Sequence, residues 1–262
     1  MTQMLAIAKN TFREAIRDRI LYGFLFFAVL LILFSVVLGQ LSFNQQIRCT
    51  LDVGLAGISF FSVLIAIFLG ITLLHKEIEK RTIYTVLSKP VSRATYLLGK
   101  FLGLAATMAV QIMLMVAVFF AVLLLMGGEL TSGLFFALAL IFVEVLLVIS
   151  LALFFTSFSS PFLSGIFCLG IFAAGRNADL ITELAKTKSL EWLQPILEGV
   201  TAVLPNFYLF FPSGKMVEES WVTVHDQFVS TGYLASTVGY GLIYTGAFLV
   251  FSMALLSRRD FV

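Results

Sequence analysis

The sequence predicts an all-α integral membrane protein with six transmembrane helices. Of its 262 residues, 60% are hydrophobic and 12% are charged, and the mean hydropathy is +1.03. A soluble domain carries roughly 25% charged residues, so this chain has too little charge to cover a water-facing surface. Its long apolar stretches mostly reach the roughly 20 residues that a helix needs to cross the hydrocarbon core. We expect one domain over residues 1–262.

Residues 1–20 predict an amphipathic helix that lies in the membrane interface. Apolar residues recur at helical spacing and include Phe12, while Arg13 and Arg17 fall on the opposite, polar face. The stretch lacks the apolar core and small-residue cleavage site of a secretory signal. We therefore expect a surface-lying helix with its apolar side in the acyl boundary.

Six apolar stretches follow, and each predicts a transmembrane helix. They cover residues 21–41, 53–74, 98–126, 133–156, 161–175 and 233–256. The fifth is short and starts at Pro161, which suits the first turn of a helix. A tilt, a locally thinner bilayer or an extension past Arg176 would each let it cross.

The distribution of Lys and Arg predicts the orientation. Twelve of the 17 basic residues fall in segments that share one side of the membrane when both termini are cytoplasmic, and the other five, Arg176 among them, fall outside. Cytoplasmic loops carry the excess of Lys and Arg in membrane proteins. We therefore expect cytoplasmic termini, a cytoplasmic loop over residues 75–100 and an external segment over residues 176–232.

The external segment contains the run VLPNFYLFFPSGK, which is too apolar for a free loop. We expect helical structure in residues 176–232, with this run re-entrant or lying on the membrane surface. Irregular backbone at membrane depth is tolerated only against protein or a water-filled cavity.

The loop over residues 75–100 predicts a helical hairpin tip. Its first helix ends before Pro90, because proline disfavours helical geometry in the preceding residue, and Ser92 or Thr95 is positioned to cap the next helix. The tip combines mixed charge with an apolar stripe that includes Leu87. This combination favours a docking surface; the alternative is that its charges only fix the topology.

Glu144 lies in the middle of the fourth apolar stretch. A carboxylate at this depth costs about 2.5 kcal/mol or more and is by default a functional-site hypothesis. One interpretation places Glu144 at a dimer centre or on a wet path, with Gln111 of the third stretch as its partner; the other is a hydrogen-bonded glutamate that fixes packing. Cys49 and Cys168 lack the spacing of a metal site or a disulfide framework, and we expect neither.

Residues of the charged loop and of the C-terminal region carry a resemblance to a known family. They are Glu77, Glu79, Lys80, Arg81, Thr82, Leu87, Lys89, Pro90, Val91, Ser92, Arg93, Gly99 and Lys100, then Leu204, Pro205 and Asn206, and the terminal RRDF. Over most of its length the chain resembles the membrane subunit of an ABC-2 type transporter. Its layout is most similar to permeases like that of the nitrous-oxide-reductase maturation system.

The resemblance implies a permease in the prokaryotic inner membrane, dimeric with itself or with a similar permease, above two copies of a separate ABC ATPase. It implies that the N-terminal helix and the loop couple the two subunits, and that Pro205 and Asn206 form an external gate. The implied coupling residues of the loop are Glu77, Glu79, Lys80, Arg81, Thr82, Leu87, Pro90, Ser92 and Arg93. Because neither Gly-Lys pair has the spacing of a phosphate-binding loop, we expect ATP and Mg²⁺ in the partner and no enzymatic activity or cofactor here.

The expected function is to couple ATP hydrolysis by the partner to export of an unidentified substrate or to mechanical work across the membrane. Membrane lipids are expected partners, a periplasmic protein is a further candidate, and no nucleic acid is expected. An ion-gradient-driven transporter would predict repeated halves with broken helices and several buried carboxylates. A non-transporting scaffold or a membrane enzyme is the remaining alternative, and an enzyme would predict clustered polar residues near one interface.

Overall fold

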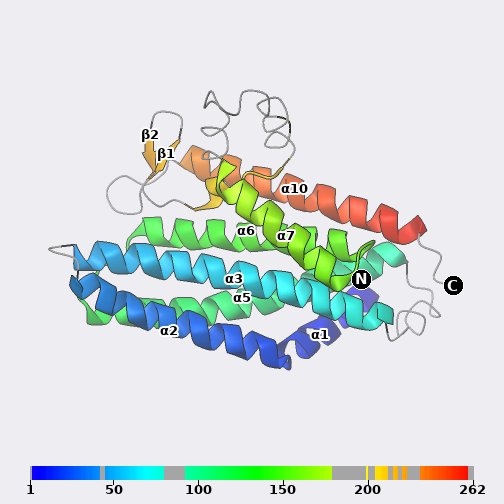
Figure 1. The fold of residues 1–262 in the computed structure, drawn as a ribbon, viewed down its shortest axis with the longest axis horizontal. Helices are drawn as coiled ribbons and strands as arrows, with labels where there is room; N and C mark the ends of the chain where they lie inside the picture. The colour runs from blue at the N-terminus through cyan, green and yellow to red at the C-terminus, as the bar shows by residue number, and fades with distance from the viewer. Residues whose placement is uncertain are drawn as a thin grey trace.

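The computed structural model describes residues 2–41, 45–79, 92–178, 199, 204–211, 215–217, 220–222 and 231–258. The elements follow in the order α1 (Thr2–Ile16), α2 (Arg19–Leu41), α3 (Gln46–Glu79), α5 (Arg93–Leu125), α6 (Ser132–Thr156), α7 (Pro161–Arg176), the 3₁₀ helix η2 (Phe207–Phe210), β1 (Lys215–Val217), β2 (Ser220–Val222) and α10 (Thr231–Arg258). The long helices lie side by side along one axis (Figure 1).

The fold class predicted from the sequence is confirmed. Among the residues that the structure describes, five helices, α2, α3, α5, α6 and α10, are long and apolar enough to cross a membrane. Each covers one of the predicted stretches to within one residue. The sixth, α7, has 16 residues and is therefore about 24 Å long, which is less than the roughly 30 Å of the hydrocarbon core. One addition was not predicted: β1 and β2 form a short antiparallel hairpin in which Met216 faces Trp221.

The ends of the helices gather into two groups. The N-terminal helix α1, the end of α3, the start of α5 and the end of α10 lie at one end of the bundle, which we call the N-terminal end (Figure 1). The end of α2 and the start of α3 lie at the opposite end, and α10 begins on that side (Figure 1). The structure does not include a membrane, so the cytoplasmic placement of the termini stays a prediction.

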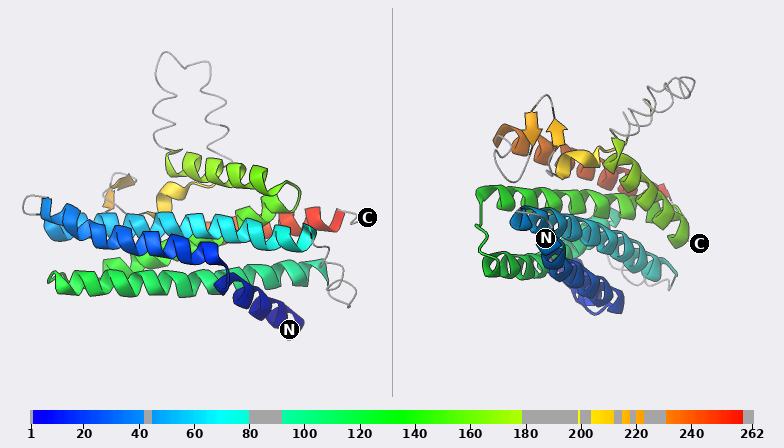
Figure 2. Two further views of the ribbon diagram at one scale, coloured as in Figure 1. Left: turned by 60° about the horizontal axis from the view of Figure 1, so that its bottom comes forward. Right: turned by 60° about the vertical axis from the view of Figure 1, so that its left-hand side comes forward.

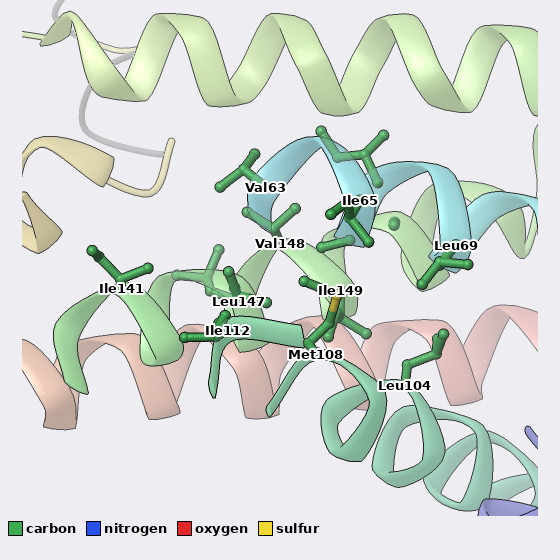
Figure 3. Close-up of a cluster of buried hydrophobic side chains, with 14 of the residues drawn as sticks. Val63, Ile65, Leu69, Leu104, Met108, Ile112, Ile141, Leu147, Val148 and Ile149 are labelled. Atoms are coloured by element: carbon green, nitrogen blue, oxygen red, sulfur yellow. The ribbon is translucent and has the colours of Figure 1, made fainter. Parts of the chain in front are cut away.

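The core of the bundle forms around α6, which packs against α3, α5, α7 and α10. Figure 3 shows apolar side chains of α3, α5 and α6 pointing toward one another, among them Ile65, Met108 and Ile149. These three side chains are almost fully buried. A helix that is apolar all round belongs in the interior, whereas α2 exposes side chains such as Phe26 and Phe34, as expected of a helix that faces lipid.

Both ends of α5 are capped by local hydrogen bonds. At its start, the Ser92 hydroxyl accepts a hydrogen bond of 3.1 Å from the Thr95 amide, which confirms Ser92 as the N-cap. At its end, Gly127 has a φ of 75°, and the Gly128 amide donates to the Leu123 carbonyl at 2.9 Å. This Schellman arrangement favours glycine and reverses the chain toward α6.

The N-terminal helix is seated on α5 by two glycines. A Cβ atom added at Gly99 would lie 2.8 Å from the Ile7 Cβ, and one added at Gly103 would lie 2.6 Å from the Ala8 carbonyl oxygen. Thr11 is fully buried in this contact. Close approach over small residues is a common way for helices to pack in membranes, so Gly99 and Gly103 act as a small-residue pair for α1.

The amphipathic character predicted for α1 agrees with this packing, but its most buried face is turned toward α5 rather than toward the acyl chains. Figure 2 shows α1 bent away from the axis of α2. Arg13 and Arg17 are exposed and Phe12 is half-buried, while Leu5 keeps 60% of its surface accessible. The expected surface-lying helix is therefore also a packed element of the bundle.

We predict that Gly103→Ala displaces α1. The new methyl group would collide with helix backbone, which cannot rotate away, and overpacking of this kind costs about 1–3 kcal/mol. Limited proteolysis of the detergent-solubilised protein would report faster cleavage within α1. Gly23→Ala is the matched control, because nothing lies within 4 Å of a Cβ at Gly23. Equal cleavage rates for both variants would contradict the seating of α1 on Gly103.

Candidate functional site

Glu144 forms an ion pair in the centre of the bundle. It lies midway along α6 with no solvent exposure, and its Oε1 accepts a hydrogen bond of 2.6 Å from Nη1 of Arg176. The Ser59 hydroxyl of α3 donates to Oε2 at 2.9 Å. We call Ser59, Glu144 and Arg176 the midmembrane cluster; it joins three helices through charge-assisted hydrogen bonds, which are the stronger kind.

The short length of α7 brings Arg176 to this depth. Pro161 begins the helix after the N-cap Ser160, at the N-terminal end of the bundle, and α7 then runs obliquely back along α6 (Figure 1). Arg176 is 15 residues further on, or about 22 Å. Glu144 lies 12 residues before the end of α6, or about 18 Å, so the two side chains meet.

This position corrects the sequence-based count of external basic residues. Arg176 was assigned to the external segment, but it is the last residue of α7 and its side chain is only 20% exposed. The carboxylate of Glu144 holds the guanidinium within the bundle, because removing either partner would leave the other unpaired in apolar surroundings. Arg176 therefore belongs with Glu144 and not with the residues that decide the topology.

Two aromatic rings complete the surroundings of Arg176. Its Cζ lies 4.3 Å from the centroid of the Phe211 ring and 5.9 Å from that of Phe172. The faces of aromatic rings attract cations, and the attraction grows when the cation is desolvated. Phe211 follows η2, so Arg176 also attaches the segment 204–211 to α7.

The segment 204–211 is packed between α7 and α10 and is not a free loop. Phe207 and Phe210 are fully buried. The backbone amide of Asn206 donates a hydrogen bond to the Tyr240 hydroxyl at 2.9 Å. The Tyr233 hydroxyl donates one to the Leu209 backbone carbonyl at 2.8 Å. Tyr240 lies seven residues further along α10 than Tyr233, or about 10 Å deeper, so the segment enters the bundle, in agreement with the re-entrant interpretation.

The predicted gate residues Pro205 and Asn206 both lie in this segment. Pro205 is buried and Asn206 is half-buried. A side chain at Gly175 would collide with the Pro205 carbonyl and with Phe207, so the glycine before Arg176 is what lets the segment approach α7. The structure thus brings Pro205 and Asn206 next to the midmembrane cluster, while their role as a gate stays a prediction.

Gln111 is not the partner of Glu144. Its side chain is buried in α5, with 2% exposure, but its Nε2 atom has no hydrogen-bond partner among the described residues. The hydrogen bonds of Glu144 come from Ser59 and Arg176 instead. The sequence offered no sign of Ser59, whereas the shortness of the fifth apolar stretch was a usable sign that Arg176 does not reach the opposite end.

The predicted coupling residues are described only in part. Lys80, Arg81, Thr82, Leu87 and Pro90 lie outside the described residues, and Glu77 and Glu79 are placed only as the last turn of α3. Ser92 caps α5. The Arg93 Nη1 donates to the Leu256 carbonyl at 2.6 Å, so Arg93 satisfies one of the carbonyls that the end of α10 leaves without a helical partner.

The family model described as ABC-2 family transporter protein matches residues 5–261. Because the match spans nearly the whole chain, the chain belongs to this family and is a permease of an ABC transporter. No curated protein matches the chain. The proposed likeness to the nitrous-oxide-reductase maturation permeases stays a prediction.

We predict that Glu144 and Arg176 are strongly coupled in stability. Glu144→Gln or Arg176→Gln alone leaves an unpaired charge in the bundle, which costs about 3 kcal/mol or more, whereas the double variant removes both charges and loses less than the sum. The thermal midpoint of the detergent-solubilised protein, measured for all four proteins, gives the double-mutant cycle. Additive losses would show that the two charges do not act as a pair.

Proposed function

We propose that this permease couples ATP hydrolysis by a separate ABC ATPase to export of a substrate or to mechanical work across the membrane. Two copies of the ATPase would act on a dimer of this chain, or on this chain and a similar permease, in the prokaryotic inner membrane. The observation that carries the proposal is membership of the ABC-2 family over residues 5–261, together with the convergence of helix ends beside the charged loop.

Several contacts support a mechanically joined N-terminal end. Lys76 of α3 forms an ion pair of 3.2 Å with Asp18, between α1 and α2. Arg93 links α5 to α10, and Gly103 seats α1 on α5. A force applied at the loop between α3 and α5 would therefore act on all of these helices together. Such an arrangement suits a surface on which an ATPase docks.

The helix α3 offers a route from this end to the midmembrane cluster. It is continuous from Gln46 to Glu79, and it carries Ser59, which binds Glu144. Glu144 holds Arg176, and Arg176 contacts Phe211 of the segment that includes Pro205 and Asn206. We infer that displacement of α3 alters this chain of contacts and so opens or closes the segment 204–211.

Two alternatives are weaker. An ion-gradient-driven transporter would need the carboxylate of Glu144 free to bind the coupling ion, but it already accepts a hydrogen bond of 2.6 Å from the Arg176 guanidinium. A scaffold that transports nothing would have no use for the series of contacts that connects α3 to the segment 204–211. Neither alternative accounts for the family match.

We predict that Arg81→Glu abolishes association with the ATPase. Reversal of a charge at a complementary interface places like charges together and costs several kcal/mol. Purification of the permease in mild detergent from its native host, with ATPase assay of the retained partners, would show a nucleotide-binding subunit with the wild type and its loss with Arg81→Glu. Glu129→Lys is the control, because Glu129 is exposed at the opposite end of the bundle. Equal retention by both variants would remove the loop as the docking site.

We further predict that Arg176→Gln separates ATP hydrolysis from movement of the segment 204–211. In the purified complex, with Cys49→Ser as background, a cysteine introduced by Asn206→Cys would react with a membrane-impermeant maleimide at a rate that depends on ATP and vanadate. Arg176→Gln should remove this dependence and leave ATPase activity within about twofold. A nucleotide-dependent rate that survives in Arg176→Gln would rule out the cluster as the link, even if the ATPase is retained.

A further inference from the structure

An open polar groove lies where α1 meets α2, beside the end of α3. Its volume is about 750 Å³, and it is lined by Arg13, Glu14, Arg17, Asp18, Arg19 and Lys76. The groove exists because α1 ends at Ile16 and α2 begins at Arg19, so the chain bends between two helices that point in different directions (Figure 2). It lies apart from the midmembrane cluster, and of its lining residues only Asp18 and Lys76 enter the mechanism proposed above.

Both carboxylates of the groove already have cationic partners. Asp18 Oδ2 forms an ion pair of 3.2 Å with Lys76, and its Oδ1 accepts a hydrogen bond of 3.0 Å from the Ile20 amide at the start of α2. Glu14 lies 4.0 Å from Nζ of Lys100, which is buried beneath α1. The two negative charges of the groove are therefore paired with Lys76 and Lys100.

Three guanidinium groups of the groove have no counter-ion among the described residues. Arg13, Arg17 and Arg19 are exposed, and no ion pair or hydrogen bond of their side chains occurs with any part of the chain that the structure describes. Arg13 lies in the last turn of α1, Arg17 follows directly after the helix ends at Ile16, and Arg19 begins α2. All three line the groove. The groove thus carries an excess of positive charge that an anion would balance.

The depth of the groove identifies the kind of anion. Arg19 is the last charged residue before the long apolar run of α2, so the three arginines lie at the level of the lipid headgroups if α2 spans the membrane. Apolar side chains that follow Arg19 on α2 are exposed: Ile20 at 45% and Tyr22 at 51%. A molecule that binds here meets cations with one part and apolar surface with the other.

We propose that this groove binds the phosphate group of an anionic phospholipid in the leaflet on the N-terminal side. Guanidinium groups form paired hydrogen bonds with phosphate oxygens, and basic pockets between membrane helices are sites of anionic headgroups. Arg13 holds the phosphate from α1, Arg17 holds it from the bend and Arg19 from the start of α2. The acyl chains lie along Ile20 and Tyr22. A bound lipid would fix the angle between α1 and α2.

The test measures binding of single lipids to the full chain in neutral detergent by native mass spectrometry. Phosphatidylglycerol is the anionic probe, and phosphatidylcholine is the zwitterionic one. Arg13→Gln and Arg17→Gln should each weaken phosphatidylglycerol binding about tenfold, the size of one hydrogen bond to a charged group. Lys9→Gln is the matched control, because Lys9 is an exposed cation of α1 that does not line the groove; it should change binding less than about twofold.

Two further measurements test whether the guanidinium group itself is needed and whether a soluble phosphate compound competes for the groove. Arg17→Lys retains the charge but loses the guanidinium fork, and it should weaken binding about threefold with elution volume and thermal midpoint unchanged, which excludes misfolding. Inorganic phosphate and ADP, added at millimolar concentration, should leave the lipid bound.

The proposal fails if phosphatidylcholine binds as tightly as phosphatidylglycerol, or if Lys9→Gln weakens binding as much as Arg17→Gln. Displacement of the lipid by inorganic phosphate or ADP would assign the groove to a soluble phosphate compound, and it would equally overturn the lipid site. None of these outcomes depends on an ATPase partner.

Discussion

A carboxylate buried in the middle of an apolar bundle needs a partner, and much of this structure follows from how Glu144 obtains one. The guanidinium of Arg176 lies 2.6 Å away, which requires that α7 end near the midplane and not at the opposite end of the bundle. Because α7 ends there, Gly175 can receive the backbone of Pro205, and the chain can enter between α7 and α10. The ion pair thus fixes where a helix stops and where an irregular segment is allowed at depth.

The N-terminal end of the bundle is organised by a different constraint, the close approach of α1 to α5. Without side chains at Gly99 and Gly103, the backbone of α1 comes near enough to bury Thr11 and to bring Glu14 to Lys100. This packing leaves Arg13 of α1 exposed. It therefore joins α1 to α5 at the N-terminal end and leaves open the groove that we assign to an anionic lipid.

The two constraints meet in α3, which contacts α1, α2, α5, α6 and α7. Lys76 binds Asp18 near one end of α3, and Ser59 binds Glu144 farther along the same helix. The mechanism that we propose requires movement to be transmitted over this distance, and a continuous helix with a polar contact at each level is suited to do so. Breaking the buried ion pair of the midmembrane cluster would be costly, because it would leave an uncompensated charge in the bundle.

The fold class, the long helices and the family could be predicted from the sequence, because hydropathy over about 20 residues and the charged loop are local signals. Glu144 and the cap Ser92 could also be recognised, since burial cost and capping depend on nearby residues. The partner of Glu144 could not, and Gln111, the candidate from the sequence, does not bind it. The packing of the helices was needed to show that Arg176 pairs with Glu144, that α1 packs on Gly99 and Gly103, and that Arg93 binds the end of α10. These contacts join residues from 32 to 163 positions apart. The pattern of residues within one segment cannot predict which side chain from a distant segment will lie beside it in the folded bundle.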